Sequence, residues 1–197
     1  MKANARRVAA GCLALVVHCA IGTAIAAGDW NVAHLMQDLA RQRGGTASFS
    51  EKKYIAILDR PVESSGELTY QPPGRLEKRT LKPIAESVVL DGDVLVVERG
   101  RQKYTLQLQQ YPEISAIVSS IRNTLSGNIE ALERQFRLDL QGNADRWSLS
   151  LLPSDPRIAA VVQRIQISGT RDDVREVEVL QADGDRSVMQ VRRGAVP

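Results

Sequence analysis

Few residues of this chain have the types and spacing that catalysis or metal binding requires. His34 is the single histidine beyond residue 26, and no serine or acid stands near it at a spacing that suggests a Ser/His/Asp arrangement. The close acids Asp172–Asp173 and Asp183–Asp185 stand in turn-like sequence, where aspartate is common. We therefore expect a surface histidine and turn-forming acids, with no catalytic residues, no metal and no cofactor, in a protein that is not an enzyme.

The first 26 residues have the pattern of a secretory leader. Lys2, Arg6 and Arg7 give it a basic start, residues 8–25 are nearly all apolar, and residues 24–26 form a small-x-small cleavage signal. A membrane anchor remains an alternative, although the apolar run is short for a span. We expect cleavage after residue 26, a mature domain from residue 27 to residue 197, and a periplasmic location.

Removing the leader changes the composition of the chain. The leader holds three of the 26 basic residues, so 23 basic residues remain against 23 acidic ones and the net charge is zero. Aromatic residues make up only 4% of the sequence. A neutral chain with few aromatic residues argues against nucleic acid as a partner. Cys12 and Cys19 leave with the leader, so the mature domain has no disulfide and no thiolate site.

The first half of the mature chain reads as one helix followed by a run of strands. Residues 30–43 have apolar positions at helical spacing and stop at Gly44–Gly45, and residues 46–58 follow as a strand. The stretch from Pro61 to Leu95 is broken by Ser-Ser-Gly, Pro-Pro-Gly and Asp-Gly turn signals, with too little chain between them for helical crossovers. This pattern predicts an antiparallel meander that ends with a strand over residues 104–108.

The second half begins with helices and returns to strands. Residues 112–125 form one apolar stripe at helical spacing, residues 129–134 a second short helix, and residues 157–162 a possible third. Alternating apolar positions then indicate strands from residue 136 to the end. Helices between two runs of strands favour an α+β fold. We predict a single domain with one strongly curved, unclosed antiparallel sheet of about 10–11 strands, a half-barrel capped by two or three helices.

Aliphatic side chains recur on one face of nearly every predicted strand and helix. The sequence allows two interpretations of this apolar surface. The apolar faces could fill an ordinary core, because amphipathic elements need no ligand to explain them. An unclosed sheet with helices over its open side can instead enclose a hydrophobic cavity.

A series of short motifs resembles the periplasmic lipoprotein carrier family, LolA-like. The motifs are Phe49-x-Glu-Lys, Ser65-Gly-Glu-Leu-x-Tyr70, Val88-Val-x-Asp-Gly-x-x-Leu95 and Trp147-x-Leu-x-Leu-x-Pro153, in this order after an amphipathic helix. The resemblance spans essentially the whole mature chain. It departs at Pro72–Pro73, where the family's carriers usually have an Arg-Pro pair whose arginine couples cargo to lid opening. The chain is similar to a divergent branch of that family.

The resemblance implies a carrier that shields the acyl chains of lipoproteins, or of a related lipidated cargo, between the inner and the outer membrane. Implied partners are the cargo, a transient inner-membrane export complex and an outer-membrane acceptor, and the protein would be a monomer. The alternative is a protein-binding or lipid-sensing regulatory module of the same fold in envelope stress signalling. The expected cavity-lining residues are Leu35, Leu39, Phe49, Leu68, Tyr70, Leu76, Val88, Leu90, Tyr104, Leu106, Ile117, Ile121, Phe136, Leu138, Trp147, Leu149 and Ile165.

Overall fold

One antiparallel sheet organises the protein. In a computed structural model that describes residues 30–194, eleven strands follow the order β6-β5-β4-β3-β2-β1-β11-β10-β9-β8-β7. The strands are β1 (Gly45–Tyr54), β2 (Val62–Gln71), β3 (Arg75–Lys82), β4 (Glu86–Asp91), β5 (Val94–Arg99), β6 (Gln102–Gln107), β7 (Phe136–Asn143), β8 (Arg146–Pro153), β9 (Val162–Thr170), β10 (Asp173–Gln181) and β11 (Arg186–Arg193). The helices are α1 (Val32–Ala40), α2 (Pro112–Leu125), α3 (Ile129–Glu133) and α4 (Pro156–Ala159), with a 3-10 turn at Leu108–Gln110.

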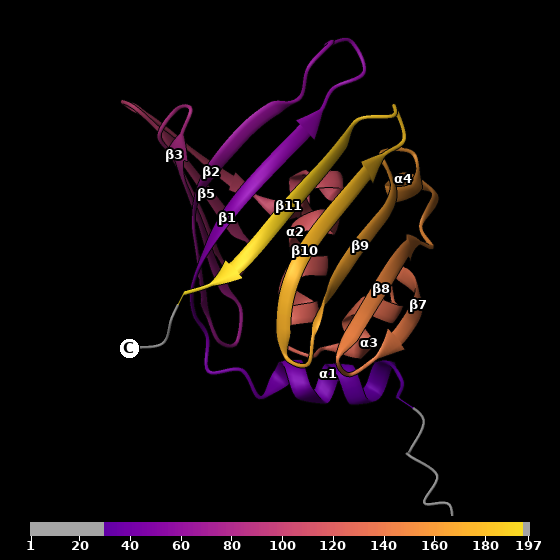
Figure 1. The fold of residues 1–197 in the computed structure, drawn as a ribbon. Helices are drawn as coiled ribbons and strands as arrows, with labels where there is room; N and C mark the ends of the chain where they lie inside the picture. Colours follow the sequence, from indigo (N-terminus) through magenta and orange to yellow (C-terminus); the bar gives the residue numbers. More distant parts are fainter. Residues whose placement is uncertain (1–29, 195–197) are drawn as a thin grey trace, which may run out of the picture.

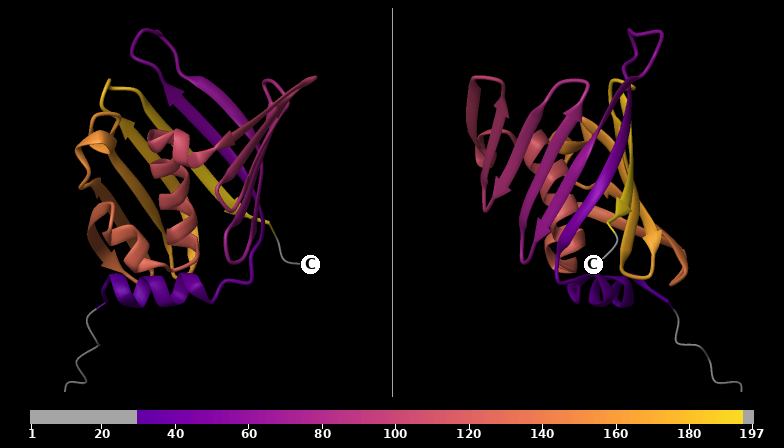
Figure 2. Two further views of the ribbon diagram at one scale, coloured as in Figure 1. Left: turned by 180° about the vertical axis from the view of Figure 1, so that it is seen from behind. Right: turned by 60° about the vertical axis from the view of Figure 1, so that its left-hand side comes forward.

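The pairing of β1 with β11 joins two meanders into this single sheet. The first meander runs from β1 to β6 and the second from β7 to β11, and Phe49 of β1 lies opposite Val191 of β11. Because β6 and β7 are the outer strands and do not pair with each other, the sheet stays open. Figures 1 and 2 show the sheet curving around α2, with α1 lying across one end of the strands. The expected α+β fold with an unclosed antiparallel sheet is confirmed.

Several expected boundaries are corrected by the structure. Helix α1 is shorter than residues 30–43, because Asn31 caps its start by accepting a hydrogen bond from the backbone N–H of His34 (3.1 Å). Strand β1 ends at Tyr54, and the apolar residues that follow it form a hairpin tip on which Ile57 is 90% exposed. The alternation of apolar residues continued into this turn and suggested a strand to residue 58. Each of the four stretches expected to be helical holds a helix in the described chain, although only two or three capping helices were expected, and α4 spans Pro156–Ala159 rather than residues 157–162.

The main hydrophobic core lies under the second meander. Trp147, Leu149 and Ile165 of β8 and β9 are at most 1% exposed and pack against helix residues such as Leu35 and Leu39. Gly127 lets the chain turn from α2 to α3 here, since it has a φ of +68° and a side chain would come within 2.3 Å of the Met36 carbonyl oxygen. A smaller cluster of Leu90, Leu95 and Leu108 lies on the first meander. The middle of the concave face lies between the two clusters.

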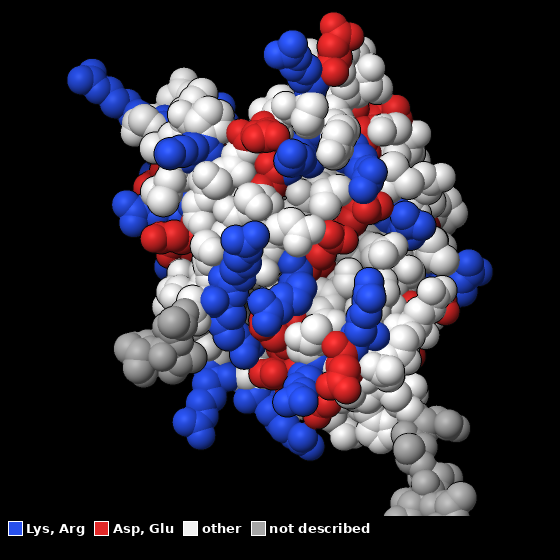
Figure 3. All heavy atoms as spheres, viewed as in Figure 1, with Lys and Arg blue, Asp and Glu red and all other residues white. Residues whose placement is uncertain are grey.

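The surface is polar and of mixed charge. On the face shown in Figure 3, basic and acidic side chains are interspersed. One such group joins three strands, where Glu178 pairs with Arg164 (3.2 Å) and Arg186 (3.1 Å). Among residues 30–194 no helix is long and apolar enough to cross a bilayer. The leader expected over residues 1–26 lies outside the described residues.

Candidate functional site: an apolar hollow between the sheet and α2

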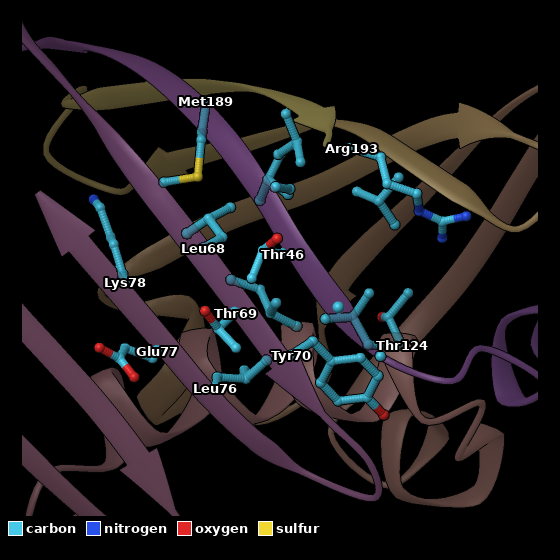
Figure 4. Close-up of a pocket in the computed structure, with 18 of the residues that line it drawn as sticks. Thr46, Leu68, Thr69, Tyr70, Leu76, Glu77, Lys78, Thr124, Met189 and Arg193 are labelled. Atoms are coloured by element: carbon cyan, nitrogen blue, oxygen red, sulfur yellow. The ribbon is translucent and has the colours of Figure 1, made fainter. Parts of the chain in front are cut away.

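A hollow of about 490 Å³ lies between the concave face of the sheet and helix α2. Figure 4 shows its side chains converging from β1, β2, β3 and β11 on the sheet side and from α2 on the other. Aliphatic carbons dominate the lining. The residues that border it are Gln42, Gly44, Gly45, Thr46, Ala47, Leu68, Thr69, Tyr70, Leu76, Glu77, Lys78, Val88, Leu90, Leu95, Val118, Ile121, Thr124, Leu125, Ile167, Asp173, Val174, Val177, Met189, Val191, Arg193 and Gly194.

Strand register brings these side chains into rows across the sheet. Tyr70 pairs with Leu76, Leu76 with Leu90, and Leu90 with Leu95, so four neighbouring strands contribute one continuous apolar row. Alternation along each strand then repeats the pattern two residues away, where Leu68 pairs with Lys78 and Lys78 with Val88. In β10 and β11, Val177 lies opposite Met189 and extends the lining across the sheet. The concave wall therefore follows directly from the antiparallel pairing of strands that are apolar on one face.

Helix α2 provides the opposite wall. Val118, Ile121 and Leu125 recur at three- and four-residue spacing, which places them on one face of the helix. Thr124 of the same face is fully buried, and its hydroxyl donates to the Ser120 carbonyl oxygen at 2.8 Å. Because this hydroxyl donates its hydrogen bond within the helix, Thr124 leaves no unpaired donor beside the hollow. The helix side of the hollow is therefore apolar as well.

An ion pair lies on the same concave face, beside the apolar rows. Lys78 pairs with Glu51 of β1, and the Lys78 ammonium also lies 4.9 Å from the centre of the Phe49 ring. The Glu51 carboxylate accepts hydrogen bonds from the hydroxyls of Ser64 (3.3 Å) and Ser187 (2.5 Å). Burial opposes ionisation of Glu51, but the Lys78 charge and these hydrogen bonds outweigh it, and the pKa of Glu51 lies below its usual value. The pair therefore places a charged group, with hydrogen bonds to both carboxylate oxygens of Glu51, beside the hollow.

A second polar group borders the hollow where β1 begins. Arg193 lies 3.4 Å from Asp172 and 3.7 Å from Asp173, and Gln42 donates to the Asp172 carbonyl oxygen. Figure 4 places Arg193 and Lys78 at opposite sides of the hollow, with the aliphatic side chains between them. An elongated apolar space between two polar groups suits an amphiphilic molecule better than a compact polar one.

A family model described as "Outer membrane lipoprotein carrier protein LolA-like" matches residues 24–195. The chain belongs to this LolA-like family. The match covers both meanders and the helices between them, so the whole described fold is the family's domain. No curated protein matches the sequence.

Three solved structures are similar to the LolA-like chain in fold at low sequence identity. A LolA superfamily protein from Nitrosomonas europaea has 9% identity and a TM-score of 0.46, with 84% of this chain and 93% of that chain covered. A DUF1329 family protein from Desulfovibrio piger has 9% identity and a TM-score of 0.48, with 84% and 92% covered. The MucA/MucB complex from Pseudomonas aeruginosa gives 15% identity and a TM-score of 0.47, with 84% and 58% covered.

Six of the seventeen residues expected to line a cavity border the hollow of this LolA-like protein. They lie on the concave face of the first meander and on the inner face of α2: Leu68, Tyr70, Leu76, Val88, Leu90 and Ile121. Burial raises the pKa of the Tyr70 phenol, whose hydroxyl donates to the Pro73 carbonyl oxygen at 3.3 Å. Whether these side chains contact a ligand stays a prediction.

The other eleven residues lie elsewhere, because their neighbours in the fold are protein side chains. Most belong to the main core or pack against it: Leu35, Leu39, Ile117, Phe136, Leu138, Trp147, Leu149 and Ile165. Phe49 is buried under Lys78, and Leu106 packs against the smaller cluster. Tyr104 is 51% exposed on the outer strand β6. Helix α1 buries Leu35, Met36 and Leu39 in the main core, and none of the three borders the hollow.

Sequence reasoning missed the lining residues that β10, β11 and the end of α2 provide. Val177, Met189 and Val191 belong to strands that were expected beyond residue 136, but the register of β11 against β1 joins residues about 140 positions apart and leaves no local signal. Val118 and Leu125 stood on the recognised apolar stripe of α2 and could have been selected from it. Among residues 30–194 no group of three His, Cys, Asp or Glu side chains could hold a metal ion. His34 stacks on Trp30 with ring centres 6.5 Å apart.

Proposed function

We propose that this LolA-like protein is a periplasmic carrier that shields acyl chains of a lipoprotein, or of a related lipidated cargo, between the inner and the outer membrane. The observation that supports the proposal most is the apolar hollow of about 490 Å³ between the sheet and α2. A space of this size lined by aliphatic side chains is large for a void in a packed interior. Family membership over residues 24–195 points to the same kind of cargo.

The size of the hollow fits a hydrocarbon chain. A volume of about 490 Å³ lies within the range of pockets that hold one small ligand, and an acyl chain of roughly 16 carbons is a ligand of that class. Each buried methylene gains about 0.8 kcal/mol relative to water, which gives an acyl chain of that length about 10 kcal/mol or more. Burial of this size is enough to hold a lipid in an aqueous compartment.

Exchange with a membrane needs no chemical step in this scheme. A bilayer offers an acyl chain the same gain as the hollow, so the transfer between them is close to neutral. A small change in the packing of α2 against the sheet is then sufficient to favour loading or release. The export complex that loads the carrier and the acceptor that empties it would act on this packing.

Lipid extraction and a binding assay test the proposal together. Protein purified without detergent is extracted and analysed by mass spectrometry, and a fluorescent fatty acid is titrated into delipidated protein. We expect a co-purified acyl lipid and saturable binding of about one fatty acid per chain, because the hollow holds one such chain. Absence of both would overturn the carrier role. A stable protein partner in a pull-down with no bound lipid would instead support a protein-binding regulatory module of the same fold.

A further inference from the structure

We propose that three hairpin tips of the first meander form a docking surface for an anionic lipid bilayer. The tips are residues 55–61, 82–85 and 100–101, which lie between β1 and β2, β3 and β4, and β5 and β6, the second of them including Lys82, the last residue of β3. They are called the docking tips below. The proposal concerns a surface outside the hollow, and it does not require that the hollow carries lipid.

The topology of the sheet brings the docking tips to one end of the molecule. Successive antiparallel strands run in opposite directions, so every second turn of a meander lies at the same end. The turn that connects β2 to β3 and the turn that connects β4 to β5 lie at the other end. Figures 1 and 2 show the docking tips projecting along one edge of the sheet, away from α1. The docking tips can therefore meet one flat surface together.

Each of the first two docking tips exposes an aliphatic side chain. Ile57 is 90% exposed, Leu58 48% and Ile84 59%. The longest tip is held in place, because Ala56 donates its backbone N–H to Asp185 (3.0 Å) and Leu58 donates to the Ile55 carbonyl oxygen (2.9 Å). A single exposed aliphatic residue on a protein surface is ordinary, but its recurrence on adjacent projecting turns indicates a surface that meets an apolar medium.

The charged residues of the docking tips indicate which kind of apolar medium the tips would meet. The tips carry Arg60, Lys82 and Arg101 against one acid of their own, Asp59, and in the structure of residues 30–194 none of the four takes part in an ion pair. Asp185 of the β10–β11 turn adds a second acid beside the first tip, where it accepts the hydrogen bond of Ala56, so the cations outnumber the acids by one. Nearby strand residues do pair, as in Arg99 with Glu86 (2.6 Å). Exposed aliphatic side chains beside free cations match the interface of a bilayer with anionic head groups, where the cations remain among the phosphates while the aliphatic groups enter the acyl boundary.

The position of the docking tips relative to the hollow agrees with a membrane-facing role. Strand β2 starts at Val62, directly after the first docking tip, and Leu68 and Tyr70 of the same strand border the hollow. Six residues of strand separate Val62 from Leu68, a distance of about 20 Å. A bilayer on the docking tips would therefore lie within about one acyl-chain length of the hollow.

Vesicle flotation tests the docking surface. Wild type and variants with the same N-terminus, verified by intact mass, are mixed with vesicles of phosphatidylcholine alone or of phosphatidylcholine with phosphatidylglycerol. We expect wild type to float with the anionic vesicles and to be released by salt. Ile57→Asp combined with Ile84→Asp should lower binding at least about tenfold, because each removes a group that inserts and adds a repelled charge. Arg101→Gln should lower binding to the anionic vesicles about fivefold and leave the neutral vesicles unaffected.

A matched control separates the docking tips from general surface effects. Val161 is an exposed aliphatic residue between α4 and β9, at the same end of the sheet as the docking tips but in the second meander, so Val161→Asp makes the same change outside the docking tips. We expect Val161→Asp to float like wild type. The proposal is overturned if wild type does not float with anionic vesicles at low salt, or if Val161→Asp loses as much binding as the tip variants. Titration of a fluorescent fatty acid into each variant reports the hollow separately, and tip variants should retain it.

Discussion

Arg122 of α2 donates a hydrogen bond of 2.5 Å to the carbonyl oxygen of Gly92, in the turn that connects β4 to β5. The same side chain lies 3.9 Å from Asp93 and passes Gly74, where a side chain would come within 3.0 Å of the Arg122 Cδ atom. One residue of the helix thus contacts two turns of the first meander. Arg122 therefore fastens the helix wall of the hollow to the sheet wall.

Removing this contact should make the hollow easier to open. We expect Arg122→Ala to release a bound fluorescent fatty acid several-fold faster and to lower the free energy of unfolding by about 1 kcal/mol, because a hydrogen bond from a charged donor is lost. Stopped-flow transfer of the probe to vesicles measures the rate. Arg134→Ala is the control, since Arg134 is 73% exposed on its side chain and lies 4.0 Å from Glu130. Equal rates for Arg122→Ala and wild type would show that Arg122 does not restrain α2.

The pair of Glu51 and Lys78 should make stability depend on acid pH. The pKa of Glu51 is lowered in the folded protein, so the carboxylate contributes stability above its unfolded pKa of about 4.3, and this contribution is lost as the pH falls through the folded pKa. Glu51→Gln should lower the free energy of unfolding at pH 7 by about 1–2 kcal/mol, because Lys78 loses its partner. Urea unfolding at pH 7 and pH 3 should show a larger difference between the two proteins at pH 7. A constant difference would contradict the assignment.

Two leucines in different halves of the sheet distinguish the packed core from the hollow. Leu149 is fully buried in the main core, and Leu149→Ala should cost about 3 kcal/mol of unfolding free energy through lost burial and the cavity left behind. Leu68 borders the hollow and is only half-buried, so Leu68→Ala should cost about 1 kcal/mol, since less apolar surface is buried there. Urea unfolding measures both. Similar costs would mean that the hollow is filled by protein.

Adjacent valines of β4 test whether the hollow binds lipid. Val88 borders the hollow, whereas the alternation of side chains along the strand directs Val89 to the opposite face. Val88→Trp should fill part of the space and weaken fatty acid binding at least about tenfold, because the lost room is worth several methylene groups of burial. Val89→Trp should bind like wild type. Thermal unfolding of both variants verifies that the fold is retained, and equal affinities would argue that lipid binds elsewhere.

Much of the fold could be predicted because its signals are local. Turn residues between short alternating segments indicated the meanders, and the apolar stripe of residues 112–125 indicated α2 with its observed bounds. The end of β1 was misjudged at Ile55 and Ile57, because an exposed tip that keeps the alternation of a strand has the same pattern as the strand itself. The exposure of Ile57 became visible only in the structure, where Ile57 is 90% exposed and Ile55 is half-buried.

The sequence by itself determined the α+β class, the order of the elements and the apolar parity of most strands. Which of those apolar faces closes into a core was decided by tertiary structure. Leu149 and Leu68 stand in strands of the same pattern, yet α1 and α3 cover the region of Leu149, while α2 stands away from Leu68 across the hollow. The difference arises from the pairing of β1 with β11 and from the curvature of the sheet. Both depend on contacts between residues far apart in the chain, which no local pattern encodes.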